Sequence, residues 1–239
     1  RVEYLGHAYT ETGKKAQAAA DTADRSHRKI STGVQSISKE LALLRNAYIG
    51  LQAAMGAINS AKGLAETADE VNNLRARIKL AVGEGELFDQ MWSRVAETAQ
   101  RTSSSLEATG TLFARLTSAG KDAGLSAQAA AEQALAITET VNQATQLSGA
   151  SAEAANAAIT QLIQGLQSGV LRGDEFNSVM EQAPRLARAL ADGLGVTVGK
   201  LCAMAEEGKL SSDVVIGALK SQAKTLQQEF GSLPATIGR

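Results

Sequence analysis

Residues 126–169 predict two consecutive α-helices in the run SAQAAAEQALAITETVNQATQLSGASAEAANAAITQLIQGLQSG. Ser126 and Ser151 suit the N-cap position, because a serine hydroxyl can accept a hydrogen bond from a free backbone N–H of the first turn. Each serine precedes a proline-free run rich in alanine, the best helix former. Gly169 suits the position after a helix, where a left-handed conformation is common. The predicted helices cover 126–147 and 152–168.

The same start and stop signals recur through the rest of residues 63–230. Ser104 with Glu107 fits a capping box, and Pro184 fits the first turn of a helix. Ser211 suits the start of the last helix, with Asp213 in its first turn. The glycines that suit helix ends are Gly83, Gly193, Gly195 and Gly208. The further predicted helices are 64–82, 86–101, 104–118, 174–183, 184–192, 198–206 and 211–230.

A heptad pattern occupies residues 30–58. Apolar residues recur there at alternating steps of four and three, which places them on a single seam of a helix. Over residues 14–62 such a helix would be about 70 Å long. A small globule cannot cover a seam of that length, so we expect a homo-oligomer through 30–58; a long amphipathic helix folded back on the rest of the chain is the alternative. The seam consists of Ile30, Val34, Ile37, Leu41, Leu44, Tyr48, Leu51, Met55 and Ile58.

The composition indicates an all-α protein of one or two domains. Hydrophobic residues make up 44% of the 239 residues and aromatic residues only 3%, which suits closely packed helices with small aliphatic side chains. Pro184 and Pro234 are the only prolines, so nothing before them forces a helix to break. The predicted fold is a long heptad-bearing N-terminal helix followed by a compact multi-helix domain. The predicted boundaries are 1–62 for the helix, 63–230 for the domain and 231–239 for a tail.

The charge balance gives no support for a nucleic acid or membrane partner. The net charge is −1, with nine basic and five acidic residues in 1–62 and 15 basic and 20 acidic residues in the remainder. The most apolar run, Leu41–Ile58, is interrupted by Arg45, Asn46 and Gln52, whereas a membrane-spanning helix needs about 20 mostly apolar residues. We therefore expect no specific nucleic acid and no membrane span.

Few residues of the chain suit catalysis, metal binding or a cofactor. His7 and His27 are the only histidines, and both lie far along the chain from Cys202, the only cysteine. A nucleophile needs a base within hydrogen-bond reach, and a zinc site needs three or four converging donors. We therefore predict no enzyme activity, no cofactor and no metal. We interpret Cys202 as a small buried apolar residue and Trp92 as a core anchor, and the lack of a possible intrachain disulfide fits a reducing compartment.

Residues 194–212 resemble a fragment of a helix-turn-helix. A recognition helix presents cationic or amide side chains to bases and phosphates. The candidate helix offers Lys200, but Glu206 and Glu207 follow on it and would repel phosphates. A packing turn is the favoured interpretation, and a DNA-binding regulator is an alternative.

Several segments together resemble the N-terminal domain of phage tail tape measure proteins. The longest is residues 166–187, LQSGVLRGDEFNSVMEQAPRLA, which we call the signature segment. The resemblance covers about residues 64–226. The other segments that carry it are residues 73–77, 106–109, 148–151, 194–196 and 207–210.

The resemblance implies a structural and assembly role in a phage or prophage tail. Tape measure proteins set tail length as extended helical rulers around which tube subunits polymerise, and they leave the tube ahead of the DNA. The resemblance also implies a place in the virion tail after assembly in the bacterial cytoplasm, with tail tube or tail-assembly chaperone proteins as partners. Part of a larger envelope-acting enzyme is a further alternative, because some long tail proteins of this family carry cell-wall hydrolases elsewhere.

The signature segment predicts a turn followed by a new helix. Gly169 and Gly173 bracket the turn, and Asp174 suits the N-cap of the next helix, with Glu175 near its positive end. One face of this helix should pack inward through Phe176, Val179 and Met180. The opposite face gives the candidate partner contact, Asn177, Glu181 and Arg185. A fold-defining corner is the alternative interpretation of the same segment.

Overall fold

The computed structural model describes residues 61–233, which belong to one compact unit of the chain. These residues form nine α-helices, and extended pairing within them is limited to one isolated bridge. The helices are α3 (Ala61–Val82), α4 (Glu86–Arg101), α5 (Leu106–Asp122), α6 (Ala127–Leu147), α7 (Ala152–Ser168), α8 (Gly173–Gln182), α9 (Pro184–Leu194), α10 (Val198–Glu206) and α11 (Ser212–Gly231). The all-α prediction is confirmed for this part of the chain. The predicted heptad helix and most of the predicted tail lie outside the described residues.

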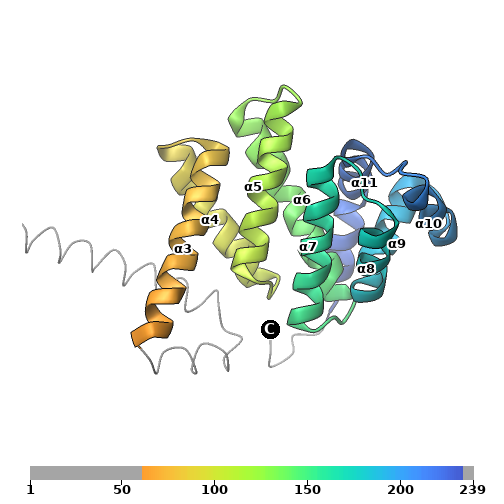
Figure 1. Cartoon of the computed structure of the whole chain (residues 1–239), viewed down its shortest axis with the longest axis horizontal. Helices are drawn as coiled ribbons and strands as arrows, with labels where there is room; N and C mark the ends of the chain where they lie inside the picture. Colours follow the sequence, from red (N-terminus) through yellow and green to blue (C-terminus); the bar gives the residue numbers. More distant parts are fainter. Residues whose placement is uncertain (1–60, 234–239) are drawn as a thin grey trace, which may run out of the picture. The chain divides into compact units, whose positions relative to one another are not determined.

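Helices α3, α5 and α7 lie side by side in one layer (Figure 1), and α5 contacts both of its neighbours. Helix α6 packs against this layer and also contacts α4, α9 and α11. Helices α9 and α11 pack on each other, while α8 contacts α7, α9 and α10. Helix α6 is therefore the central helix of the described domain.

The composition of α6 explains its central position. Ten of its 21 residues are alanine or threonine, so neighbouring helices can approach closely, and its two charged residues are Glu132 and Glu139. Its fully or almost fully buried apolar residues are Ala130, Ala131, Ala134, Leu135, Ile137, Val141 and Ala144.

A small polar cluster lies inside the core formed by α4, α5 and α6. The Asn142 side-chain amide is buried and donates to Thr102 Oγ1 at 3.1 Å and to Thr109 Oγ1 at 3.0 Å. The Thr102 hydroxyl in turn donates to the carbonyl of Thr98 at 2.7 Å. Buried polar groups need such partners, because an unpaired group loses its bonds to water without compensation. The cluster therefore ties the turn between α4 and α5 to α6.

Serine side chains cap the helices predicted to start after Ser126, Ser151 and Ser211. Each hydroxyl accepts a hydrogen bond from a backbone N–H in the first turn, as an N-cap residue does. The donating N–H groups belong to Ala129, Ala154 and Val214. These three predicted helix starts are confirmed.

The predicted cap at Ser104 is wrong by one residue. Ser105 is the N-cap of α5 and accepts from the backbone N–H of Ala108 at 3.3 Å. Ser103 has a φ of 51°, so the backbone turns sharply just before this helix. The Ser104 hydroxyl instead donates back to the carbonyl of Thr102 at 3.3 Å. The backbone turn thus moves the capping position one residue along the chain.

The prediction that Gly193 ends a helix is also wrong. Helix α9 continues through it, and Gly195 is the residue with the left-handed φ of 66°. A Cβ on Gly193 would lie 2.5 Å from the carbonyl oxygen of Ala218 on α11 and 2.8 Å from its Cα. Gly193 therefore permits a close approach of two helices. Gly83 and Gly208 do follow helices with positive φ, as predicted.

The remaining helix ends differ from the predictions by about one turn or less. Helix α3 begins at Ala61 and runs through Gly63, where the sequence predicts a boundary. Helix α5 extends to Asp122, beyond its predicted end. None of the described helices combines the length and the hydropathy that crossing a membrane requires.

Candidate functional site

The signature turn, residues 168–173, connects α7 to α8. Helix α7 ends at Ser168, and Gly169 has a φ of 84°, a conformation that strains any residue with a Cβ. The Ser168 hydroxyl donates to the carbonyl of Val170 at 2.9 Å. Val170 forms an antiparallel bridge with Ser211, the N-cap of α11. The turn is therefore tied to a segment about 40 residues further along the chain.

Three hydrogen bonds hold the two segments together. The N–H of Leu171 donates to the carbonyl of Leu210 at 2.8 Å, and the N–H of Ser212 donates to the carbonyl of Gly169 at 3.0 Å. The Ser212 hydroxyl donates to the carbonyl of Leu166 at 3.0 Å. Leu171 and Leu210 are both buried. The signature segment and the last segment of the resemblance thus form one corner of the fold.

Gly165 is a residue of this corner that sequence reasoning missed. A Cβ on it would lie 2.5 Å from Leu171 Cδ1 and 3.0 Å from Leu171 Cα, so α7 and the turn touch without room for a side chain. A glycine within a helical pattern was the available signal, because its poor helix propensity calls for a packing reason. These contacts favour the fold-defining corner as the role of the signature turn.

Helix α8 starts one residue earlier than predicted. Gly173 is its first residue, and Arg172 occupies the N-cap position without a side-chain capping bond. The prediction that Asp174 caps this helix is therefore wrong, because the side chain lies inside the first turn. Asp174 and Glu175 still lie near the positive end of the helix dipole. The inward face is as predicted for Phe176 and Val179, which are buried, while Met180 is half-buried.

The structure places the three candidate contact residues on two helices. Asn177 and Glu181 are exposed on α8. Arg185 lies on α9, because the backbone leaves the helical conformation at Ala183 with φ −141° and ψ 69°, and Pro184 starts the next helix. Asn177 and Glu181 therefore share one exposed face, and their role in a partner contact stays a prediction.

Arg185 already has partners within the domain. Its Nε donates to Glu229 Oε2 at 2.7 Å and its Nη2 donates to Glu229 Oε1 at 2.8 Å, a two-pronged contact that joins α9 to α11. These hydrogen bonds hold the pKa of the Glu229 carboxyl below its ordinary value. The Arg185 side chain is only 15% exposed. The sequence predicted that Arg185 lies on an exposed polar face. Its partner, Glu229, lies 44 residues further along the chain, so the spacing of nearby residues did not reveal it.

The segment proposed as a helix-turn-helix fragment, residues 194–212, contains the short helix α10 and runs from the end of α9 to the start of α11. Helix α9 ends before Gly195, and Thr197 caps α10 by accepting from the backbone N–H of Lys200 at 3.2 Å. The ammonium of Lys209 forms an ion pair with Glu207 and lowers the pKa of that carboxyl. The segment therefore carries anionic side chains beside its cations, which does not suit a phosphate-binding surface.

The coiled-coil seam, Ile30 to Ile58, lies outside the described residues and stays a prediction, as do any roles of His7 and His27. Within residues 61–233 no group of three or more His, Cys, Asp and Glu side chains could hold a metal. The prediction that Cys202 is buried is wrong, because the side chain is half-buried, and its Sγ lies 3.8 Å from Met180 Sδ.

Trp92 is half-buried on α4 rather than fully buried in the core. The guanidinium of Arg75 lies over its ring at 5.3 Å from the centroid and over the Phe88 ring at 5.6 Å. Such cation–π contacts attract α3 to α4. The prediction that Trp92 is a core anchor is therefore wrong, and the ring packs at the edge of the core against a cation.

A shallow pocket of about 650 Å³ lies between α4 and α6. Ion pairs of Arg94 with Glu132 and of Arg101 with Glu139 cross between the two helices there. The lining contains no histidine, cysteine or lysine. The residues that line it are Arg94, Glu97, Thr98, Gln100, Arg101, Leu135 and Glu139.

The described part of the chain is thus an all-helical module whose polar side chains mainly cap helices, join them or face solvent. Comparison with protein families gives the class, which is a structural component of a phage tail. The family model described as tape measure protein matches residues 62–239, and the chain belongs to this family of phage tail structural proteins. No curated protein and no solved structure matches the chain.

Proposed function

We propose that the chain helps to set the length of a phage tail and is released together with the DNA. The family match over residues 62–239 carries this proposal. The nature of the described polar groups supports it, because they stabilise a scaffold and do not form a catalytic constellation. The chain would then act as a structural component of the virion tail, assembled in the bacterial cytoplasm and without enzyme activity.

We propose that the heptad region and the compact domain have different functions in the tail. The longest described helix, α3, has 22 residues and would reach about 33 Å at 1.5 Å per residue, so the compact domain is too often interrupted by turns to be a ruler. The heptad region through residues 30–58 suits a ruler, because it predicts an uninterrupted helix that associates with a second copy. The compact domain would then dock to a tail tube or tail-assembly chaperone protein, with Asn177 and Glu181 as candidate contacts.

Lengthening the heptad region tests the ruler function. An insertion of four heptads should lengthen the tail by roughly 42 Å, because about 28 residues at 1.5 Å per residue would be added to a helix in phase with the seam. Tail length is measured by electron microscopy of phage that depend on the altered gene. An equally long insertion in the turn at Gly83–Gly85 is the control, because it extends a surface loop and should leave tail length unchanged. Intact tails of ordinary length from the heptad insertion would contradict the ruler function.

A further inference from the structure

Two arginines bridge the layer formed by α3, α5 and α7. Arg77 on α3 donates from Nη1 to the hydroxyl of Thr111 on α5 at 3.1 Å. Arg115 on α5 donates from Nε and Nη2 to the side-chain oxygen of Gln167 on α7, at 2.7 and 3.1 Å, with the Gln167 amide oriented to satisfy both. Both arginines are exposed. Each guanidinium is therefore fixed by a neutral acceptor, and its charge is not compensated by that contact.

A third cation, at the end of the layer, also binds a neutral acceptor. Lys121, near the C-terminus of α5, donates from Nζ to the backbone carbonyl of Ala81 near the end of α3, at 2.8 Å. We call Arg77, Arg115 and Lys121 the cationic strip. None of the three forms an ion pair with a described residue.

Three cations elsewhere in the domain that join two helices bind carboxylates, whereas Lys220 on α11 donates to Gln133 on α6 and Arg75 on α3 lies over aromatic rings of α4. The α4–α6 contact uses Arg94 with Glu132 and Arg101 with Glu139, and the α9–α11 contact uses Arg185 with Glu229. A position towards the C-terminal end of a helix favours a cation through the helix dipole. The dipole does not explain why the layer of α3, α5 and α7 uses neutral acceptors for its three bridging cations. The layer of α3, α5 and α7 is therefore bridged by three cations, none of which binds a described carboxylate.

The geometry of the strip favours binding of a carboxylate. Thr111 and Arg115 are four residues apart on α5, so they are neighbours on one helical face, and the Arg77 guanidinium bound to Thr111 lies on that face as well. A guanidinium has five N–H donors, and the contacts with Thr111 and Gln167 leave several of them free. Because these contacts already restrict the side chains, less conformational entropy is lost when a ligand binds.

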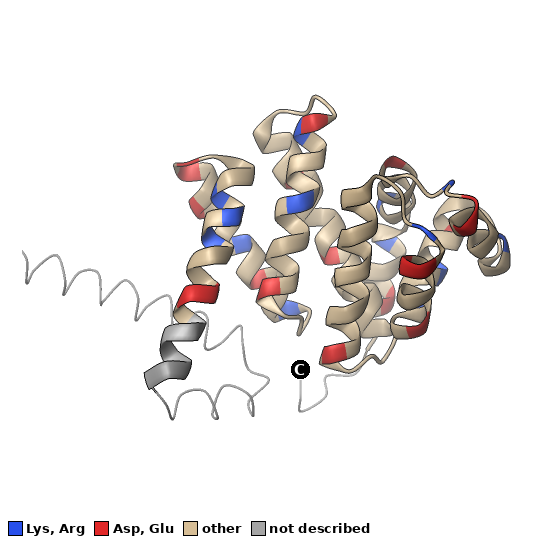
Figure 2. Cartoon of the chain, in the orientation of Figure 1, with Lys and Arg blue, Asp and Glu red and all other residues tan. Residues whose placement is uncertain are grey.

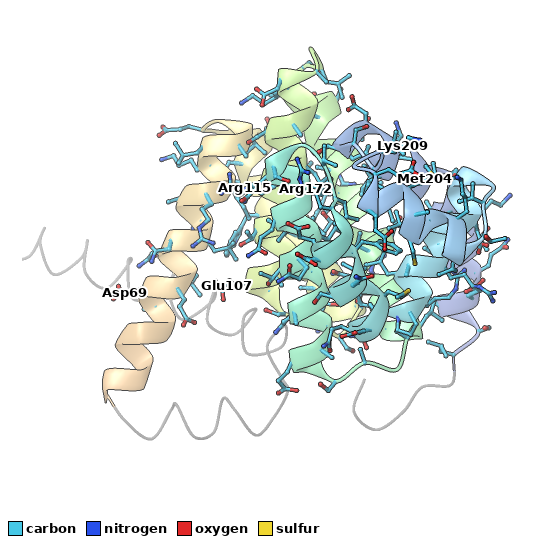
Figure 3. All side chains as sticks on the ribbon, turned by 45° about the vertical axis from the view of Figure 1, so that its right-hand side comes forward. Asp69, Glu107, Arg115, Arg172, Met204 and Lys209 are labelled. Carbon is cyan, nitrogen blue, oxygen red and sulfur yellow. The ribbon has the colours of Figure 1, made fainter. Side chains whose placement is uncertain are left out.

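Acidic residues limit the strip along α5. Glu107 precedes it by two turns and Asp122 follows Lys121 directly, and both are exposed. Figure 2 shows acidic positions towards the lower ends of α3, α5 and α7, basic positions above them on α3 and α5, and an acidic position beside the basic one at the upper end of α5; Figure 3 places Arg115 above Glu107 and Asp69. A nucleic acid strand carries a charge every 3.4 Å or so and would meet these carboxylates wherever it left the strip. A short carboxylate-bearing segment would not.

We propose that the cationic strip binds an acidic segment of a partner protein, with Arg77 and Arg115 each donating to a carboxylate and Lys121 adding a third positive charge. Arginine suits this role because its planar donor pairs match the two oxygens of a carboxylate. The proposal rests on the geometry of the layer and holds or fails independently of the tail-length function. It also places a docking surface on a different layer from Asn177 and Glu181.

The test measures binding of a fluorescein-labelled hexaglutamate peptide to the full chain by fluorescence anisotropy at low salt. Arg77→Gln combined with Arg115→Gln should weaken binding at least fivefold. The matched control is Lys200→Gln combined with Lys224→Gln, which removes the same charge from exposed positions on α10 and α11 and should change the affinity less than twofold. Circular dichroism melts confirm that all variants are folded. A labelled oligodeoxythymidine is measured in parallel.

Each other outcome overturns the proposal. Equal weakening by the two double variants would show that only the overall charge of the chain matters. A peptide that does not bind the unaltered chain would show that the strip is too weakly charged to recruit carboxylates. If the oligodeoxythymidine binds more tightly than the peptide and loses affinity only with the Arg77 and Arg115 changes, the strip is a nucleic acid surface instead.

Discussion

Replacing Gly193 by alanine should destabilise the compact domain by about 2 kcal/mol. The added Cβ would meet the carbonyl oxygen, the Cα and the carbonyl carbon of Ala218 at 2.5, 2.8 and 2.9 Å. These are backbone atoms of α11, so a rotamer change cannot relieve the contact and the two helices must move apart. Overpacking of this kind costs up to about 3 kcal/mol. The better helix propensity of alanine returns about 1 kcal/mol.

Gly217→Ala is the matched control. Gly217 lies within α11, is exposed, and a Cβ there would have no atom within 4 Å. The substitution therefore changes helix propensity without changing packing. It should stabilise the domain by up to about 1 kcal/mol. The two alanine variants should then differ by about 3 kcal/mol.

Urea unfolding of the full chain, followed by tryptophan fluorescence, measures both effects. Trp92 is the only tryptophan and lies in α4, so its emission reports the compact domain and not the heptad region. With a slope of about 2 kcal/mol per molar urea, Gly193→Ala should lower the unfolding midpoint by about 1 M. A Gly193→Ala variant as stable as Gly217→Ala would refute the close approach of α9 and α11. Gly193 would then be an ordinary residue at a helix end.

Three further predictions concern the ion pair, the seam and the exposed face of α8. Hydrogen bonds from Arg185 lower the pKa of Glu229, so the pair stabilises the folded state above the unfolded pKa of about 4.5. This contribution is lost as the pH falls through the folded pKa of Glu229. Glu229→Gln should therefore remove that part of the acid dependence of stability in urea titrations. Leu44→Asp should dissociate the heptad assembly of a peptide of residues 14–62 in analytical ultracentrifugation, because it places an unpaired charge in the seam. If the unaltered peptide is a monomer at high micromolar concentration, the predicted homo-oligomer is wrong. Asn177→Ala with Glu181→Ala should change stability by less than about 0.5 kcal/mol and still abolish tail assembly in phage complementation; normal tails would exclude α8 as the docking face.

The chemistry of neighbouring residues was sufficient to predict many of the helix starts. Ser126, Ser151 and Ser211 each bind an N–H three residues ahead, and a bond of that range depends only on the residues around it. The same reasoning gave the wrong residue at Ser104, because the conformation of Ser103 shifts the cap and nothing in the local pattern distinguishes three consecutive serines. The resemblance located the signature segment but did not show how it packs.

The sequence by itself determined the all-helical class and the positions of most turns in residues 61–233, since capping, propensity and apolar spacing act over a few residues. Only the tertiary structure decided what the signature segment touches. At Gly165 and Gly193 a larger side chain would overlap Leu171 and Ala218, which come close only after folding. Arg185 donates a hydrogen bond to Glu229 on another helix. Contacts of this kind join residues far apart in the chain, so their partners depend on how the helices pack and cannot be read from the spacing of residues on any one helix.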